Sequence, residues 1–254
     1  MARALHRLFI LLSGAAAIGA APAPTPAPRQ PTLAVGDGAI SGRRLTPYTN
    51  AWMFSVRRPD GSRVDQGIWS DVLRRRDLGG RSVFERVQGM TYGNGLMSST
   101  INRFDPETLA PVTGEQHTPD GRVVKRSFAG RHVSSRITPA PGAPEQLHEA
   151  DLPVPVYDFN GGMYGMLLAA QPLRLGHRGV LPAIAEFTDD YDTVPFRVVR
   201  RERVRAGHLG RVGAWVVEVG EPTAMTFWIS ERAPYIIRLV LPMNGSEASF
   251  DMIG

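Results

Sequence analysis

The stretch RVGAWVVEVGEPTAMTFWISERAPYIIRLVLP, residues 211–242, decides the fold class, because apolar and polar side chains alternate along it with a period of two. Such alternation is typical of β-strands with one buried face and one exposed face. Three strands are predicted here, with apolar faces formed by Trp215, Val217 and Val219, by Met225, Phe227 and Ile229, and by Tyr235, Ile237, Leu239 and Leu241. A fourth strand is predicted at residues 250–253, where Phe250 and Met252 alternate with polar neighbours.

Turn signals separate apolar runs along most of the chain. Pro-Asp-Gly occurs at residues 59–61 and 119–121, and Asn244-Gly245 lies between two predicted strands. These combinations favour tight turns, and Asn-Gly is a strong hairpin signal. Turns that recur roughly every ten residues indicate an antiparallel sheet rather than alternating strands and helices. The sequence therefore predicts a mainly β protein.

The N-terminus has the pattern of an export signal. Residues 1–20 contain Arg3 and Arg7, no acidic residue, an apolar run from Leu8 and small residues at the end. This pattern is typical of a cleaved secretory signal peptide, and the run is too short for a permanent membrane span. Residues 21–35 are rich in proline and predict an extended linker, followed by a single β-rich domain at 36–254. We expect a periplasmic protein without a membrane anchor.

Composition narrows the possible partners. The formal net charge of +5 falls to +3 when residues 1–20 are removed, so the mature chain has only a mild positive charge. Together with export, this makes intracellular nucleic acid an unlikely partner, and we predict no nucleic-acid binding. The absence of cysteine excludes disulfides, thiolate zinc sites, cysteine nucleophiles and a lipid anchor attached to an N-terminal cysteine.

One segment departs from the strand pattern. Residues 163–171 lie between Asn160 and Pro172, which predict the start and the stop of a short apolar helix. Two interpretations remain open: a plain cover on one side of the sheet, or a cover over an apolar cavity lined by adaptable methionines. Under the second interpretation, the candidate ligand-binding residues are Met163, Tyr164, Met166, Leu167, Trp215, Phe227 and Trp228.

Four arginines form a second candidate site. Arg197, Arg201, Arg203 and Arg205 fall on alternating positions of a predicted strand and so share one face. Guanidinium groups bind phosphate and carboxylate by paired hydrogen bonds, so this stripe is a candidate site for an anion or a lipid headgroup. The alternative is a solvated face of the sheet. Peripheral contact with a membrane follows from the first interpretation.

The common catalytic and metal-binding motifs are missing. There is no G-x-S-x-G, H-E-x-x-H or P-loop sequence, and five histidines are scattered singly after residue 20. The acidic residues between Glu186 and Asp192 favour a solvated loop over a metal site, since their spacing does not match a calcium loop. We therefore predict no enzyme activity, no cofactor and no metal. A catalytic triad assembled from distant residues, as in an unrecognised hydrolase, remains an alternative.

From about residue 95 to its end, the chain resembles a family of exported bacterial proteins known only as a domain of unknown function. The resemblance rests on residues 105–109, 156–159, 171–173, 181–183, 198–204, 214–219, 226–229 and 234–238. More distantly, the chain is similar to the LolA and LolB lipoprotein carriers. That resemblance implies a strongly curved antiparallel sheet, a half-barrel or open barrel, around an apolar cavity that holds acyl chains. The carriers cover this cavity with several helices, whereas the sequence here predicts one short covering helix.

Three hypotheses follow. The first is a non-enzymatic periplasmic protein that binds an apolar or amphipathic ligand, such as a lipid or a lipoprotein acyl chain, in the half-barrel. The second is a structural or assembly module of the cell envelope that docks a protein partner through a face or an edge of the sheet. The third is the unrecognised hydrolase.

Overall fold

The structure is a computed structural model, and it describes residues 30–159, 163–184, 190–243 and 245–254. Within these ranges, fifteen strands form one sheet in the order β8-β7-β6-β5-β4-β3-β2-β1-β15-β14-β13-β12-β11-β10-β9. Every neighbouring pair is antiparallel except β9 and β10, which are parallel. Because β1 pairs with β15, the first and last strands lie side by side in the middle of the sheet, and β8 and β9 are its edges.

The sheet has two arms on either side of the β1–β15 pairing. The first arm contains β1 (Tyr48–Arg57), β2 (Arg63–Leu78), β3 (Arg81–Tyr92), β4 (Met97–Phe104), β5 (Pro111–His117), β6 (Val123–Ala129), β7 (His132–Thr138) and β8 (Gln146–Asp151). The second arm contains β9 (Tyr157–Asp158), β10 (Arg178–Ile184), β11 (Tyr191–Arg205), β12 (Arg211–Val219), β13 (Met225–Ser230), β14 (Ile236–Met243) and β15 (Ser246–Met252). The described helices are α1 (Tyr164–Ala169) and the 3-10 turns η1 (Gly42–Arg44) and η2 (Gly207–Leu209).

Both Pro-Asp-Gly sequences form the hairpin turns that they predict. The first connects β1 to β2, and the amide of Gly61 donates to the carbonyl of Arg58 at 2.9 Å. The second connects β5 to β6, with the same contact from Gly121 to Thr118 at 3.0 Å. Both glycines have a φ above +80°, which explains why this residue closes the turn. The predicted Asn244-Gly245 turn includes Asn244, which lies outside the described residues.

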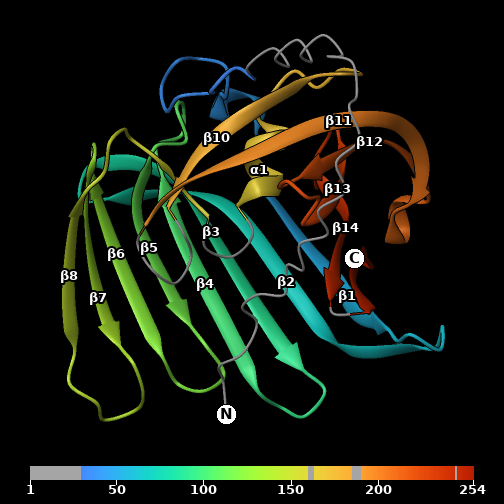
Figure 1. Ribbon diagram of the computed structural model, residues 1–254, viewed down its shortest axis with the longest axis horizontal. Coiled ribbons are helices and arrows are strands. Elements are labelled where there is room, and N and C mark those ends of the chain that lie inside the picture. Colours follow the sequence, from blue (N-terminus) through green and yellow to red (C-terminus); the bar gives the residue numbers. More distant parts are fainter. Residues whose placement is uncertain (1–29, 160–162, 185–189, 244) are drawn as a thin grey trace, which may run out of the picture.

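The two arms curve toward each other, and α1 lies between them (Figure 1). Gly165 permits this close packing, because a Cβ at that position would lie 2.3 Å from Cδ1 of Ile236 on β14. The side chains of Met166, Leu167 and Leu168 are fully buried. No ladder joins β8 to β9 among the described strands, so the sheet stays open. The predicted fold class is confirmed: a mainly β, strongly curved antiparallel sheet with one short helix.

The helix is shorter than the sequence predicts. It begins at Tyr164 and ends at Ala169, with Ala170 as its C-terminal cap residue, instead of continuing to Gln171. The predicted N-terminal cap, Asn160, lies outside the described residues.

Polar contacts also connect the two arms. Asp158, on the edge strand β9, accepts a hydrogen bond of 2.9 Å from Asn102 on β4 and lies 3.9 Å from the guanidinium of Arg126 on β6. All three side chains are buried. These contacts hold the edge strand β9 against β4 and β6 on the inner side of the opposite arm without a hydrogen-bonded ladder.

The N-terminal segment packs against the sheet before residue 35. The amide of Leu33 donates to the carbonyl of Val180 on β10 at 2.9 Å, and Leu33 is buried. Further along, the amide of Gly42 donates to the carbonyl of Glu107 at 2.7 Å. The turn that contains Glu107 is held by Asp105, whose carboxylate accepts from the amides of residues 107 and 108. Residues 105–109 therefore form a docking turn for this segment.

Candidate ligand-binding site on the inner face of the sheet

The inner face of the sheet is the face that contacts α1. Tyr48 on β1 and Arg86 on β3 reach the sulfur atoms of Met166 and Met163, so their side chains point inward. Side chains two residues along a strand share a face. Asn50, Trp52 and Phe54 therefore follow Tyr48 along the inner face, and their cross-strand neighbours on β2 and β3 lie beside them.

A buried ion pair lies under the helix. Arg86 donates from Nε and Nη2 to the two carboxylate oxygens of Asp71, each at 2.9 Å, and Tyr48 donates its hydroxyl to Asp71 at 2.7 Å. The side chains of Asp71 and Arg86 are 0% and 1% exposed. Burial, followed by the charge of Asp71, raises the pKa of Tyr48 well above its usual value, so the hydroxyl stays protonated as a donor. Both carboxylate oxygens of Asp71 are therefore occupied.

Two buried amides flank this ion pair. In the register of the sheet, Asn50 on β1 is the neighbour of Asp71 on β2, which is the neighbour of Gln88 on β3. Asn50 and Gln88 are each 2% exposed, and neither the nitrogen nor the oxygen of either amide has a hydrogen-bond partner in the described structure. A buried polar group left in this state costs about 1–3 kcal/mol. The two amides thus keep unused donors and acceptors beside the ion pair in the described structure.

Aromatic side chains continue the same face away from the helix. Trp69 neighbours Trp52 across the strands with ring centroids 5.6 Å apart, and Phe54 stacks on Phe250 at 4.7 Å. Tyr92 meets Phe54 edge to face at 6.4 Å. Phe54, Trp69 and Tyr92 are only partly buried. We call the amides of Asn50 and Gln88, together with the rings of Phe54, Trp69 and Tyr92, the inner-face site.

The structure leaves little room directly beneath the helix. A space of about 10 Å³ lies there, bordered by Asn102, Phe104, Tyr157, Met163 and Leu167, and a space of that size holds about one water molecule. Of the residues predicted to line a cavity, Met163, Met166, Leu167 and Phe227 are buried in the main hydrophobic core. Tyr164 stacks on Phe159 at 3.9 Å. The helix residues predicted to line a cavity, Met163, Met166 and Leu167, are thus packed into the core around a space for about one water molecule.

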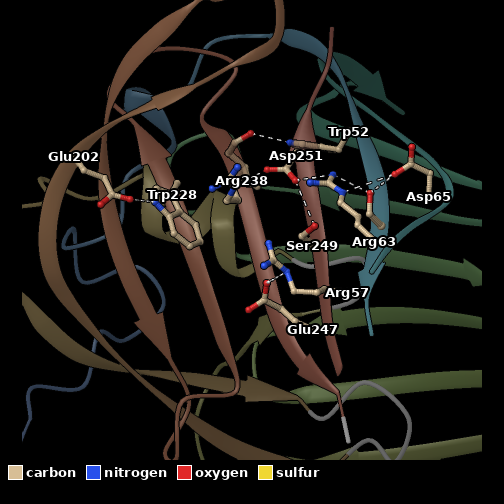
Figure 2. Close-up of polar contacts among 12 residues, drawn as sticks. Trp52, Arg57, Arg63, Asp65, Glu202, Trp228, Arg238, Glu247, Ser249 and Asp251 are labelled. Atoms are coloured by element: carbon tan, nitrogen blue, oxygen red, sulfur yellow. Dashed lines mark hydrogen bonds and ion pairs between the residues drawn. The ribbon is translucent and has the colours of Figure 1, made fainter. Parts of the chain in front are cut away.

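The two predicted tryptophans lie elsewhere. Trp215 borders a groove of about 350 Å³ beside α1, together with Ala169, Leu173 and Ile229. Trp228 follows Phe227 in β13 and points to the opposite, outer face, where its Nε1 donates to Glu202 (Figure 2). Trp228 is buried in the same core cluster as Phe227, but its ring lies on the other face of β13.

The arginine stripe divides into paired and unpaired members. Arg197 forms an ion pair with Glu218 at 2.6 Å, and Arg201 with Glu231 at 3.1 Å while it also lies over the ring of Trp215. Arg203 and Arg205 make no ion pair with a carboxylate in the described part of the chain. Of the four arginines predicted to bind an anion, Arg203 and Arg205 are thus the two that carboxylates in the described part of the chain do not neutralise.

Three of the five histidines after residue 20 have side-chain contacts in the described structure. His117 and His132 pair with Glu115 and Asp151 at the surface, at 2.8 and 3.1 Å. His177 packs edge to face on Phe196, and burial, followed by the charge of Arg174, lowers its pKa. No group of three or more His, Asp or Glu side chains in the described ranges is placed to hold a metal ion.

The inner-face amides were missed by sequence reasoning, although β1 carries a signal for one of them. The alternation Tyr48, Asn50, Trp52, Phe54 places a polar amide in the middle of an apolar face. Such a break in the pattern often marks a functional position. For Gln88 the same alternation is hidden, because buried side chains occur on both faces of β3. Only the strand register shows that the two amides are neighbours of Asp71.

Comparisons with known proteins give a structural similarity and a family match. A crystal structure titled as a beta-barrel-like protein of domain of unknown function DUF1849, from Brucella abortus, is similar over 83% of this chain and 97% of its own, with a TM-score of 0.44 and 11% identity. No curated protein matches the chain significantly. Among the described residues, no helix is both long enough and apolar enough to cross a membrane. A family model for a protein of unknown function, DUF3108, matches residues 81–252, and the chain therefore belongs to the DUF3108 family.

Proposed function

We propose that the protein is a non-enzymatic binding protein and that its ligand is amphipathic and occupies the inner-face site. The observation that carries the proposal is the pair of buried amides, Asn50 and Gln88, which have unused donors and acceptors on a face otherwise formed by aromatic rings and a neutralised ion pair. Small-molecule sites commonly combine apolar walls with a few convergent polar groups in this way.

The chemistry of the site favours an uncharged polar group on the ligand. Asp71 and Arg86 neutralise each other, so the site offers no unpaired charge to an ion. A side-chain amide both donates and accepts, and its natural partners are hydroxyl, ester and amide groups. The half-exposed rings of Phe54 and Trp69 suit an alkyl chain. The polar linkage and chain of an acylglycerol, or of a lipoprotein acyl group, have both features.

Titration with 1-monododecanoylglycerol below its aggregation concentration tests the proposal. Trp69 lies in the site, so binding is expected to change the tryptophan fluorescence of the protein. Glycerol lacks the chain and methyl dodecanoate lacks the hydroxyl donors, and we expect both to bind at least tenfold more weakly. Equal binding of methyl dodecanoate would show that the amides do not contribute.

A variant of Gln88 separates binding from folding. Gln88→Leu removes the amide but keeps an apolar side chain of similar size. Removal of an unpaired buried amide is expected to leave the free energy of unfolding unchanged or to raise it. The same change is expected to weaken binding of the probe at least tenfold. Gln146→Leu on the edge strand β8 is the matched control, because Gln146 is exposed and β8 lies far from β1, β2 and β3 in the sheet. Loss of stability in Gln88→Leu without loss of affinity would contradict the proposal.

We further propose that the ligand is met in the periplasm. Residues 1–20 have the basic, apolar and small-residue order of an export signal, and they support this location. N-terminal sequencing of the mature protein from a periplasmic fraction tests it. Cleavage close to residue 20 is expected, and an intact N-terminus in the cytoplasmic fraction would contradict export.

A further inference from the structure

A shallow groove rich in arginine lies at the tip of the β11–β12 hairpin. Its volume is about 690 Å³, and its lining includes Arg203 and Arg205 from β11, His208 from η2, Arg211 from β12 and Arg238 from β14. No aspartate or glutamate is among its lining residues in the described structure. We call this surface the arginine groove.

The pairing of arginines changes along β11 where the groove begins. Arg197, Arg200 and Arg201 each form an ion pair with a glutamate, at 2.6, 2.9 and 3.1 Å. Arg203 and Arg205, further along the same strand, have no carboxylate partner in the described ranges, and Arg211 opposite them also has none. The strand therefore neutralises its arginines outside the groove and leaves them with net positive charge inside it.

Two of these guanidinium groups are held in place by the backbone. Arg203 donates from Nη2 to the carbonyl of Arg211 at 3.2 Å, and Arg211 donates from Nη2 to the carbonyl of Arg203 at 3.3 Å. A guanidinium has five N–H donors, so each retains most of them for another partner. Carbonyl contacts orient the side chains without cancelling their charge. The donors are thus positioned before any ligand arrives.

The 3-10 turn η2, which forms one wall of the groove, packs against the backbone of Ile253. Gly207 in η2 has a φ of +46°, and a Cβ at this position would lie 2.7 Å from the backbone of Ile253. This close approach fixes η2 against the C-terminal segment. Arg238 enters from the outer face of β14 beside Trp228, and it forms an ion pair with Asp251, which also binds Arg63 (Figure 2).

We propose that the arginine groove binds a phosphate group, carried either by a lipid headgroup or by a soluble phosphate compound. A carboxylate offers two oxygens to guanidinium groups, whereas a phosphate group offers at least three and carries more negative charge, so it can accept from more guanidinium groups at once. Arginines on β11, β12 and β14 surround the groove and match that demand. The site is separate from the inner-face site, because Arg238 and Asp251 point away from α1 while Leu239 and Phe250 point toward it.

Binding to two phosphate sources tests this proposal. Sedimentation with vesicles of phosphatidylglycerol and phosphatidylcholine measures headgroup binding, with pure phosphatidylcholine as the reference. Calorimetric titration with tripolyphosphate measures binding of soluble phosphate. Binding to the anionic vesicles alone would identify a lipid headgroup as the source of the phosphate, and binding to tripolyphosphate would identify a soluble compound. Either result supports the proposal, and no binding to either probe overturns it.

Variants distinguish the groove from general charge attraction. Arg205→Ser/Arg211→Ser is expected to lower affinity for the bound probe at least tenfold. Arg58→Ser/Arg232→Ser is the matched control: it removes the same charge at two exposed arginines outside the groove and is expected to lower affinity less than twofold. Equal losses in the two double variants overturn the proposal. Arg205→Gln alone, compared with Arg58→Gln, gives the same comparison if the first double variant unfolds.

Discussion

Replacement of Arg86 by methionine leaves the buried carboxylate of Asp71 without its counter-charge. In the folded protein this carboxylate accepts two hydrogen bonds from Arg86 and one from Tyr48, all at 2.7–2.9 Å. Methionine keeps an apolar side chain in place but supplies no donor. Removal of one partner of a buried ion pair costs about 3–5 kcal/mol. We therefore expect Arg86→Met to lower the free energy of unfolding by about 3–5 kcal/mol, a large share of the ~5–15 kcal/mol typical of a domain.

A double-mutant cycle identifies the origin of that loss. Asp71→Leu alone removes the carboxylate that pairs with the buried Arg86 and is expected to cost a similar amount. The double variant Arg86→Met/Asp71→Leu buries neither charge, and its main defect is the hydroxyl of Tyr48, which loses its carboxylate acceptor and keeps only the weak sulfur acceptor of Met166 at 3.0 Å, at a cost of at most about 1–3 kcal/mol. The double variant is therefore expected to be more stable than either single variant.

Urea unfolding at pH 7, followed by both tryptophan fluorescence and circular dichroism, measures these free energies. Coincident transitions from the two probes establish that each variant unfolds in two states. The reasoning is refuted if either single variant loses less than about 1 kcal/mol, or if the loss in the double variant equals the sum of the single losses.

Two further changes test the acid dependence of stability and the packing of the N-terminal segment. Burial acts to raise the pKa of Glu85, but hydrogen bonds from Arg74 and Arg103 outweigh it and hold that pKa below its usual value. The contribution of Glu85 is therefore present above pH ~4.5 and is lost as the pH falls through the lowered pKa. Glu85→Gln should lower the free energy of unfolding by about 1–3 kcal/mol at pH 7. Urea unfolding at pH 7, 5 and 3 should show that this free energy falls less with acid in the variant than in the wild type. An equal fall in both proteins would contradict the role of Glu85. Gly42→Ala places a Cβ 2.4 Å from the carbonyl oxygen of Pro106 and should lower the free energy of unfolding, measured with urea, by about 1–3 kcal/mol. In the control Gly93→Ala, the added Cβ makes only an ordinary contact. Equal losses of stability in the two variants would refute the packing argument.

Local patterns were enough to predict the architecture. The alternation in residues 211–242 predicts β12, β13 and much of β14, because each strand contributes apolar side chains to the same core. The Pro-Asp-Gly turns were predicted correctly because the geometry of a turn depends on only a few consecutive residues. The length of α1 was overestimated, since Ala170 and Gln171 leave the helix although their composition is compatible with one.

Features that depend on register were not predictable in this way. The four arginines of β11 look equivalent in the sequence, but Glu218 and Glu231, which neutralise two of them, come from β12 and from the segment after β13. Similarly, Asn50 and Gln88 are 38 positions apart, and only the pairing of β1, β2 and β3 places them on either side of Asp71. A single sequence shows which residue types could form these sites, but it does not show which residues from other strands lie next to them.

The central claim is that the amides of Asn50 and Gln88 bind a ligand that comes from outside the protein. A high-resolution crystal structure of protein purified from its own cells, without detergent, tests it most directly through the electron density at these two side chains. The account predicts continuous density within hydrogen-bond distance of both amides that extends toward Phe54 and Trp69. Density for isolated water molecules alone at both amides would contradict it.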